Sequence, residues 1–185
     1  MQVAGVVLAG GEGTRFGGPK ALAELDGVRL VDRGVHTLRD AGCRPVCAVL
    51  GAAVTEVPDA DAVVVNPEWR SGLGSSLRAA LAADALQNAS AALIVLVDQP
   101  WIAAEAARRL IEAHQAGTTL AVATYDGVRG HPILIGREHW AGVAALAAGD
   151  VGARHYLAEH RDEVVEVPCE AGSPRDVDTP DDLLR

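Results

Sequence analysis

Residues 3–20 read Val-Ala-Gly-Val-Val-Leu-Ala-Gly-Gly-Glu-Gly-Thr-Arg-Phe-Gly-Gly-Pro-Lys, an apolar run that changes abruptly into a glycine-rich loop. The run Val3–Ala9 has no polar side chain, which is typical of a strand buried on both faces in a parallel sheet. In such sheets, ligands bind beyond the carboxyl ends of the strands, where this loop would lie. The stretch therefore predicts both the fold class and the place of the functional site.

The loop itself has the composition of an anion site. Five glycines among residues 9–20 leave backbone N–H groups free of side-chain cover, and successive N–H groups form a concave nest for an anion. Arg15 adds a planar fork of donors and Lys20 a mobile point charge, which together suit a triphosphate. We interpret the loop as a phosphate cradle; the alternative is a flexible turn with two solvated cations.

Two common phosphate-binding patterns do not fit this loop. The Walker pattern needs Gly-Lys-Ser/Thr, whereas the chain reads Pro19-Lys20-Ala21. A dinucleotide fingerprint built on Gly11 and Gly13 would need its third glycine at Phe16. A nicotinamide oxidoreductase is therefore disfavoured.

Apolar runs and helical patterns alternate along the rest of the chain. Further strands are expected at Val46–Leu50, Ala62–Val65, Ala91–Val97, Leu120–Thr124, Pro132–Ile135 and Val164–Val167. Helices are expected at Leu30–Ala41, Leu77–Leu86, Ala103–Ala116 and Val151–Arg161, with a last one capped by Thr179. The pattern predicts an α/β fold, a single doubly wound, mostly parallel sheet with helices on both faces. We expect residues 1–185 to form one domain.

The composition excludes several classes of partner. Apolar residues make up 49% of the chain, which is enough for a sizeable core and too much for a disordered protein. A net charge of −9 disfavours binding to nucleic acid and to anionic lipid. No membrane span or signal peptide is recognised, and the cysteines suggest no disulfide framework. We therefore expect a cytoplasmic protein.

The motifs resemble those of a known family. Leu8-Ala9-Gly10-Gly11, Arg15-Phe16-Gly17 and Lys20 are similar to the signature L-A-[AG]-G-x-x-x-R-[MF]-G-x-x-K of nucleotidyltransferases that act on sugar phosphates, isoprenoid precursors and the molybdenum cofactor. Later segments resemble the molybdenum cofactor cytidylyltransferase branch: Asn66-Pro67-Glu68-Trp69, Gly72-Leu73-Gly74-Ser75-Ser76-Leu77, Val97-Asp98-Gln99-Pro100, Gly130-His131-Pro132 and Asp176-Val177-Asp178-Thr179-Pro180. The resemblance spans residues 4–185 and implies a Rossmann-like nucleotidyltransferase fold.

Asp98 is the candidate metal ligand. It follows the most apolar run of the chain, where a lone carboxylate would cost on the order of several kcal/mol without a cation. Mg²⁺ takes one or two carboxylates plus phosphate oxygens and water, so Asp98 is either such a ligand or the N-cap of the next helix. The resemblance assigns it to Mg²⁺ and implies Asp178 as the second ligand. Asp176 is the alternative, because it shares a side with Asp178 in an extended segment.

The resemblance also implies the nucleotide contacts. The expected nucleotide-binding residues are Leu8, Ala9, Gly10, Gly11, Gly13, Arg15, Lys20, Asn66, Gly74, Ser75 and Ser76, and the expected catalytic residues are Arg15, Lys20 and Asp98. The serine hydroxyls either contact the base or cap a helix. Gly10 and Gly13 depart from the cytidylyl branch, which usually has alanine and serine there. CTP is the expected donor, and GTP is the alternative.

The reaction implied is nucleotidyl transfer, in which an acceptor phosphate attacks the α-phosphorus of a nucleoside triphosphate and pyrophosphate leaves. The resemblance implies a molybdopterin-type acceptor that contacts His131, although a lone histidine beside a strand is as often structural. It allows a molybdoenzyme or a chaperone as protein partner. The alternatives are another phosphorylated metabolite as acceptor and a non-catalytic nucleotide- or cofactor-binding module.

Overall fold

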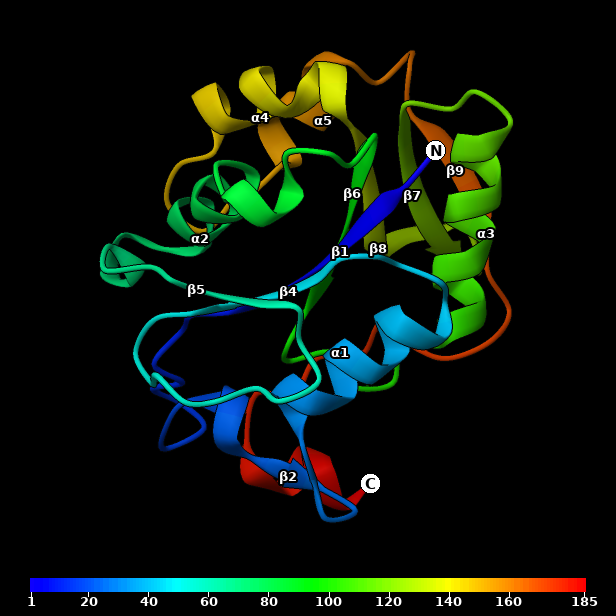
Figure 1. The fold of residues 1–185 in the computed structure, drawn as a ribbon. Helices are drawn as coiled ribbons and strands as arrows, with labels where there is room; N and C mark the ends of the chain where they lie inside the picture. The colour runs from blue at the N-terminus through cyan, green and yellow to red at the C-terminus, as the bar shows by residue number, and fades with distance from the viewer.

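The computed structural model describes all 185 residues and contains a seven-stranded sheet with the order β5-β4-β1-β6-β8-β7-β9 (Figure 1). The strands are β1 (Val3–Ala9), β4 (Val46–Leu50), β5 (Ala62–Val65), β6 (Ala91–Leu96), β7 (Leu120–Tyr125), β8 (Val128–Gly136) and β9 (Val165–Pro168). Only β8 runs antiparallel to its neighbours. The predicted mostly parallel, doubly wound sheet is confirmed.

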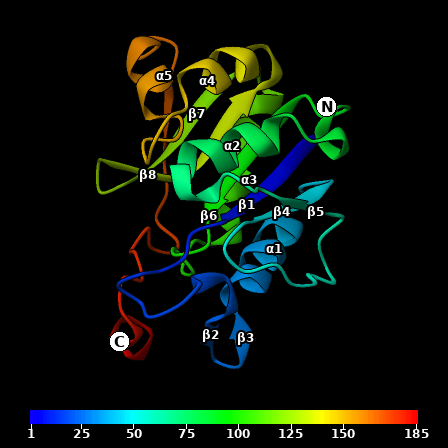
Figure 2. The ribbon, with the colours of Figure 1, turned by 90° about the vertical axis from the view of Figure 1, so that its left-hand side faces the viewer.

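Helices cover both faces of this sheet (Figure 2). The helices are α1 (Leu30–Asp40) and α3 (Ala104–Gln115) on one face, and α2 (Leu73–Leu81), α4 (Trp140–Leu146) and α5 (Arg154–Glu159) on the other. Successive side chains of a strand point to opposite faces, so β1 places Val3 and Val7 in the core under α1 and α3, and Ala4 and Val6 in the core under α2. This two-sided burial explains why β1 has no polar side chain.

Several elements differ from the sequence-based expectation. α2 begins at Leu73, four residues earlier than expected, and a separate 3₁₀ turn follows it at Asp84–Leu86. β8 extends back to Val128 through a partly exposed hairpin arm that lacks a continuous apolar run. The apolar pattern does not predict α4, and the last expected helix is a 3₁₀ turn over Pro180–Leu184.

The carboxyl edge of the parallel strands carries the irregular segments. Between the glycine-rich loop and α1, β2 (Glu24–Leu25) and β3 (Val28–Arg29) form a small hairpin whose turn residues, Asp26 and Gly27, both have positive φ. This hairpin, the loop after β1 and the C-terminal turn lie at the same end of the molecule (Figures 1 and 2). No helix is both long enough and apolar enough to cross a membrane.

Candidate functional site

The glycine-rich loop folds back on itself directly after β1. The carbonyl oxygen of Gly13 accepts hydrogen bonds from the backbone N–H groups of Gly17 at 2.9 Å and Gly18 at 3.1 Å. Gly13 has a φ of +63°, and a Cβ there would lie 2.0 Å from the carbonyl oxygen of Gly18. The closed loop therefore excludes a side chain at this position, which explains why glycine stands where the cytidylyl branch usually has serine.

Lys20 lies at the centre of an ionic cluster drawn from distant parts of the chain. Its Nζ lies 3.6 Å from Oδ2 of Asp98 and 3.7 Å from Oδ1 of Asp178. A guanidinium nitrogen of Arg15 lies 3.4 Å from the same oxygen of Asp178. The Lys20 side chain is only 16% exposed, whereas that of Arg15 is 80% exposed. The structure thus brings these four residues together, with Lys20 inside the cluster and Arg15 at its rim.

The C-terminal segment is fixed beside the end of β6. The backbone carbonyl of Asp98 accepts a hydrogen bond of 2.7 Å from the N–H of Val177, whose side chain is fully buried. Asp176 instead accepts a hydrogen bond from Nε2 of Gln99 at 2.8 Å. Since Asp178 faces Lys20 and Asp176 is bound to Gln99, the geometry favours Asp178 as the partner of Asp98.

The Asp98 carboxyl is in an environment that opposes its charge. Burial raises the pKa of Asp98, the nearby Lys20 ammonium lowers it, and the charge of Asp176 raises it further. The carboxylate therefore depends on a neighbouring cation. That dependence fits a phosphate or metal site better than a structural N-cap.

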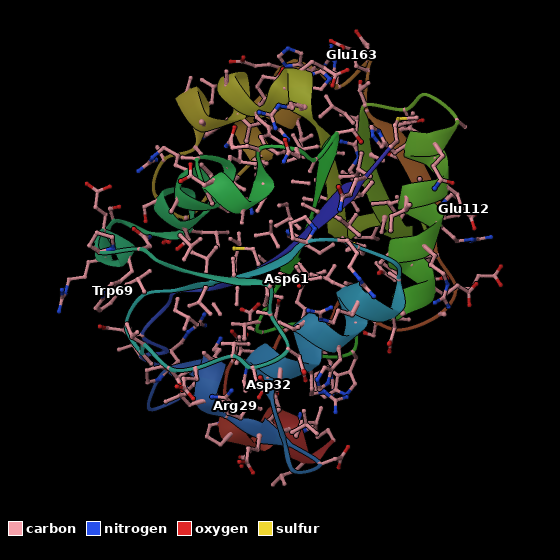
Figure 3. All side chains as sticks on the ribbon, viewed as in Figure 1. Arg29, Asp32, Asp61, Trp69, Glu112 and Glu163 are labelled. Atoms are coloured by element: carbon pink, nitrogen blue, oxygen red, sulfur yellow. The ribbon has the colours of Figure 1, made fainter.

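A cavity of about 740 Å³ opens beside the cluster, within the usual range of about 300–1,000 Å³ for small-molecule sites. The predicted residues that line it are Leu8, Gly10, Gly11, Gly13, Arg15, Lys20, Ser76 and Asp98. The cavity extends to the 3₁₀ turn Trp69–Ser71 after β5, where Trp69, labelled in Figure 3, is one of the lining residues. Among the predicted nucleotide-binding residues, Ala9, Asn66, Gly74 and Ser75 do not line it, and neither does the predicted metal ligand Asp178.

Asn66 belongs to the wall of this cavity rather than to its surface. Its Nδ2 donates to the hydroxyls of Ser75 at 2.8 Å and Ser76 at 3.1 Å, and its Oδ1 accepts from the N–H of Glu68 at 2.9 Å. Asn66 is only 2% exposed, and its expected contact with the nucleotide stays a prediction. In this structure it positions Ser76, whose hydroxyl lies within the first turn of α2.

The position of Ser76 also accounts for the glycine at position 10. A Cβ at Gly10 would lie 2.7 Å from the hydroxyl oxygen of Ser76, so alanine does not fit while Ser76 keeps its place. The departure from the cytidylyl motif at this position therefore follows from local packing.

The loop after α4 closes the site from the opposite side. Gly74 donates its N–H to the carbonyl of Gly149 at 2.8 Å, and the N–H of Leu73 lies 3.4 Å from Oδ1 of Asp150. A Cβ at Gly72 would lie 2.5 Å from the carbonyl oxygen of Gly149. Sequence reasoning missed Asp150, although the Gly-x-Gly pattern at the start of α2 is a signal of close backbone approach.

Arg70 is a second residue that sequence reasoning missed. Its guanidinium lies 4.3 Å from the centre of the Trp69 ring, and the side chain lines the cavity without an acidic partner. Arg70 lies between the motif Asn66–Trp69 and the motif that begins at Gly72, and a cation at that place was the available signal. It adds a third positive charge to the cavity.

A second cavity of about 500 Å³ adjoins the first, because Leu8, Leu73, Leu96 and Asp150 line both. Hydrophobic residues make up 12 of the 20 that line it, so its surface is mainly apolar. His131 lies here, and burial lowers the pKa of His131 to about 4, which leaves the ring neutral at pH 7.

The two arginines of the second cavity differ in their pairing. Arg129 is bound to Glu166, with 2.7 Å between Nε and Oε1. Arg154 is exposed, lines the same cavity and forms no ion pair. Arg154 is therefore the cation that this cavity can offer to a ligand.

Asp98 and Asp178 are the two carboxylates beside the glycine-rich loop that could hold a divalent metal. The chain has no cluster of three or more His, Cys, Asp or Glu side chains that could hold a metal by itself. Two carboxylates suit Mg²⁺, which commonly completes its coordination with phosphate oxygens and water. The residues present therefore fit a metal that is held jointly by the protein and a nucleotide.

A family model and several known proteins match most of the chain. The model of the MobA-like NTP transferase domain matches residues 5–164. The chain is 36% identical to nicotine blue oxidoreductase of Paenarthrobacter nicotinovorans, over 99% of this chain and 95% of that protein. It is also 36% identical to the probable molybdenum cofactor guanylyltransferase of Opitutus terrae, over 68% of this chain and 62% of that protein.

Solved structures match over nearly the whole chain. The crystal structure of Rv0371c from Mycobacterium tuberculosis H37Rv has a TM-score of 0.83 and 32% identity, covering 98% of this chain and 95% of that one. Its complex with manganese matches with a TM-score of 0.78 and 29% identity, covering 98% and 96%.

Proposed function

Because the chain belongs to the family of MobA-like NTP transferase domains, we propose that it transfers a cytidylyl group from CTP to the phosphate of a molybdopterin-type cofactor and releases pyrophosphate. The family makes the chain a nucleotidyltransferase; the nucleotide, the acceptor and Mg²⁺ are the proposed parts. The observation that carries the proposal is the cluster of Lys20 with Asp98 and Asp178 beside the glycine-rich loop.

The proposed reaction is an in-line displacement at the α-phosphorus. An acceptor phosphate oxygen forms the new P–O bond, the α–β phosphoanhydride bond breaks, and its electron pair leaves on pyrophosphate. No general base is needed, because the acceptor phosphate is already ionised at neutral pH. Catalysis then consists of positioning and charge neutralisation.

Each residue of the first cavity has a proposed part in this step. The loop amides and Arg15 hold the β- and γ-phosphates, and Lys20 neutralises charge that develops at the α-phosphate. Asp98 and Asp178 would hold a divalent metal, which would supply further positive charge to the phosphates. Ser76 and the backbone around Gly10 are left to contact the base.

The second cavity is the proposed acceptor site. Its apolar lining suits a flat ring system, and neutral His131 can exchange a hydrogen bond with a ring substituent. Arg154 supplies the unpaired cation for an anionic or carbonyl group of the acceptor. Since the two cavities adjoin at Leu8 and Asp150, an acceptor phosphate can reach the Lys20 cluster.

One assay tests nucleotide and acceptor together. Pyrophosphate release is measured with each of the four nucleoside triphosphates, with and without purified molybdopterin. We expect release with CTP that depends on molybdopterin. Greater release with GTP than with CTP would make GTP the nucleotide donor, in line with the relative named guanylyltransferase. If none of the four nucleotides released pyrophosphate in the presence of molybdopterin, molybdopterin would be rejected as the acceptor.

A redox reaction is the second candidate, and one observation favours it. The relative named nicotine blue oxidoreductase aligns with 99% of this chain, a larger share than the relative named guanylyltransferase. A reductase would need a hydride donor such as a reduced nicotinamide dinucleotide. The glycine-rich loop lacks the third glycine of a dinucleotide fingerprint, and α1 does not begin until Leu30. We therefore expect no oxidation of NADH or NADPH by the purified protein with a quinoid dye as acceptor.

A further inference from the structure

We propose that Lys20 blocks the metal site in the free protein, so that Asp98 and Asp178 accept a divalent cation only when a triphosphate draws the Lys20 ammonium away. This inference rests on the proposed function, since it concerns the regulation of the same site. It makes Lys20 responsible for the order in which the site is filled.

The first support is that Lys20 faces the oxygens a metal would use. Its Nζ lies 3.6 Å from Oδ2 of Asp98 and 3.7 Å from Oδ1 of Asp178, so one ammonium holds both carboxylates. The Lys20 side chain is 16% exposed and that of Asp98 is 28% exposed, so water screens this contact less than it would on an open surface. A second cation between the same carboxylates would be repelled by the ammonium.

The second support is the position of the lysine stem. A Cβ at Gly13 would lie 3.5 Å from Cγ of Lys20, so the stem runs past the loop that is proposed to hold the phosphates. A bound triphosphate would therefore offer the ammonium several anionic oxygens close to its present position. The long flexible stem of lysine permits such a shift, which a rigid guanidinium fork would permit less readily.

Arg15 reinforces the same block from the rim of the site. Its guanidinium lies 3.4 Å from Oδ1 of Asp178, the oxygen that also faces Lys20. Two cations thus neutralise the two carboxylates in the free protein. Both are the groups that a triphosphate attracts, so its arrival frees both carboxylates at once.

The test measures Mn²⁺ binding to the full chain without nucleotide, by the loss of the free Mn²⁺ electron paramagnetic resonance signal. We expect Lys20→Met to bind Mn²⁺ about tenfold more tightly than the wild type, because one adjacent positive charge is removed. Arg70→Gln is the matched control: it removes a cation from the same cavity that touches neither carboxylate, and its Mn²⁺ affinity should equal that of the wild type. Asp98→Asn in the Lys20→Met background should abolish the gain.

A second arm adds the non-hydrolysable analogue α,β-methylene-CTP, after correction for Mn²⁺ held by the analogue alone. The analogue should increase Mn²⁺ binding to the wild type by a larger factor than in Lys20→Met. Equal or weaker Mn²⁺ binding by Lys20→Met without nucleotide would overturn the inference. Failure of the proposed function is a separate result, namely no pyrophosphate release by the wild type. Lys20→Gln serves in place of Lys20→Met should the latter lose its native circular dichroism spectrum.

Discussion

At the scale of one residue, the partly buried carboxylate of Asp98 depends on a neighbouring cation. Burial raises the pKa of Asp98, because desolvation disfavours the ionised carboxylate. The ionised form therefore needs the positive charge of Lys20 or of a metal. Replacing Asp98 by Asn keeps the size and removes the charge. We expect kcat for pyrophosphate release to fall by about 10²–10³, while the melting temperature is retained or raised.

Asp176→Asn is the control for this substitution. Asp176 lies on the same segment as Asp178 but accepts a hydrogen bond from Gln99, so a change of less than about tenfold in kcat is expected. A wild-type kcat in Asp98→Asn would remove Asp98 from the reaction.

Arg154 gives a prediction about the acceptor at the same scale. Replacing Arg154 by Gln should raise KM for molybdopterin about tenfold, which corresponds to about 1.4 kcal/mol, and leave KM for the nucleotide unchanged. The reason is that Arg154 lines only the second cavity and forms no ion pair within the protein. Steady-state kinetics with each substrate varied in turn provide the measurement.

Arg129→Gln is matched to it, because Arg129 lines the same cavity but is held by Glu166. Its effect on KM for molybdopterin should be smaller. If Arg154→Gln raised KM for the nucleotide instead, the assignment of the two cavities would be wrong.

The residues that sequence reasoning located and those it missed differ in a physical way. Arg15, Lys20 and Asp98 could be found because charge beside a glycine-rich loop or at the end of an apolar strand is unusual for structure alone. The wall position of Asn66 and the docking of Asp150 depend on hydrogen-bond partners chosen in three dimensions. These hydrogen-bond partners cannot be predicted from the sequence around Asn66 or Asp150.

At the scale of elements, α2 and the loop that docks on it decide the shape of both cavities. A Cβ at Gly74 would lie 2.7 Å from the backbone nitrogen of Ala148. Overpacking of this kind costs about 1–3 kcal/mol, whereas replacing glycine by alanine inside a helix gains about 1 kcal/mol. We therefore expect Gly74→Ala to lower the free energy of unfolding by about 1 kcal/mol, measured by urea denaturation.

Gly18→Ala is the comparison for this change, since a Cβ at Gly18 meets no atom within 4 Å and the backbone is not in the left-handed region. It should leave stability unchanged or slightly raised. A Gly74→Ala protein as stable as Gly18→Ala would show that the docked loop shifts without cost.

The sequence predicts the bounds of some strands and helices and not of others. Strands such as β1 and β4 could be located to the residue, because both faces are buried and the run is uniformly apolar. The start of α2 could not, because Gly74, Ser75 and Ser76 are weak helix formers that tertiary contacts hold in the first turn. α4 was missed since its Ala- and Gly-rich sequence carries little periodic signal.

At the scale of the whole molecule, His131 couples stability to pH. Its pKa is about 4 in the folded protein because of burial, against about 6.5 in an unfolded chain. Between these values the unfolded chain binds more protons, so stability falls as the pH decreases through this window. We expect the wild type to lose about 2 kcal/mol more unfolding free energy than His131→Gln between pH 7 and pH 5.

Urea denaturation of both proteins at the two pH values measures this difference. The comparison with His131→Gln is needed because the raised pKa of Asp98 acts in the opposite direction in its own pH range. Equal losses in the two proteins would mean that His131 is protonated freely in the folded state.

The contact between Arg15 and Asp178 joins positions 163 residues apart. During synthesis, the ribosome delivers the loop after β1 long before Asp178, and all seven strands of the sheet precede Asp178 in the chain. A nascent chain can therefore possess a folded framework and still lack Asp178, one of the two carboxylates that pair with Lys20. Under the proposed function, nucleotidyl transfer therefore waits until Asp178 has emerged from the ribosome.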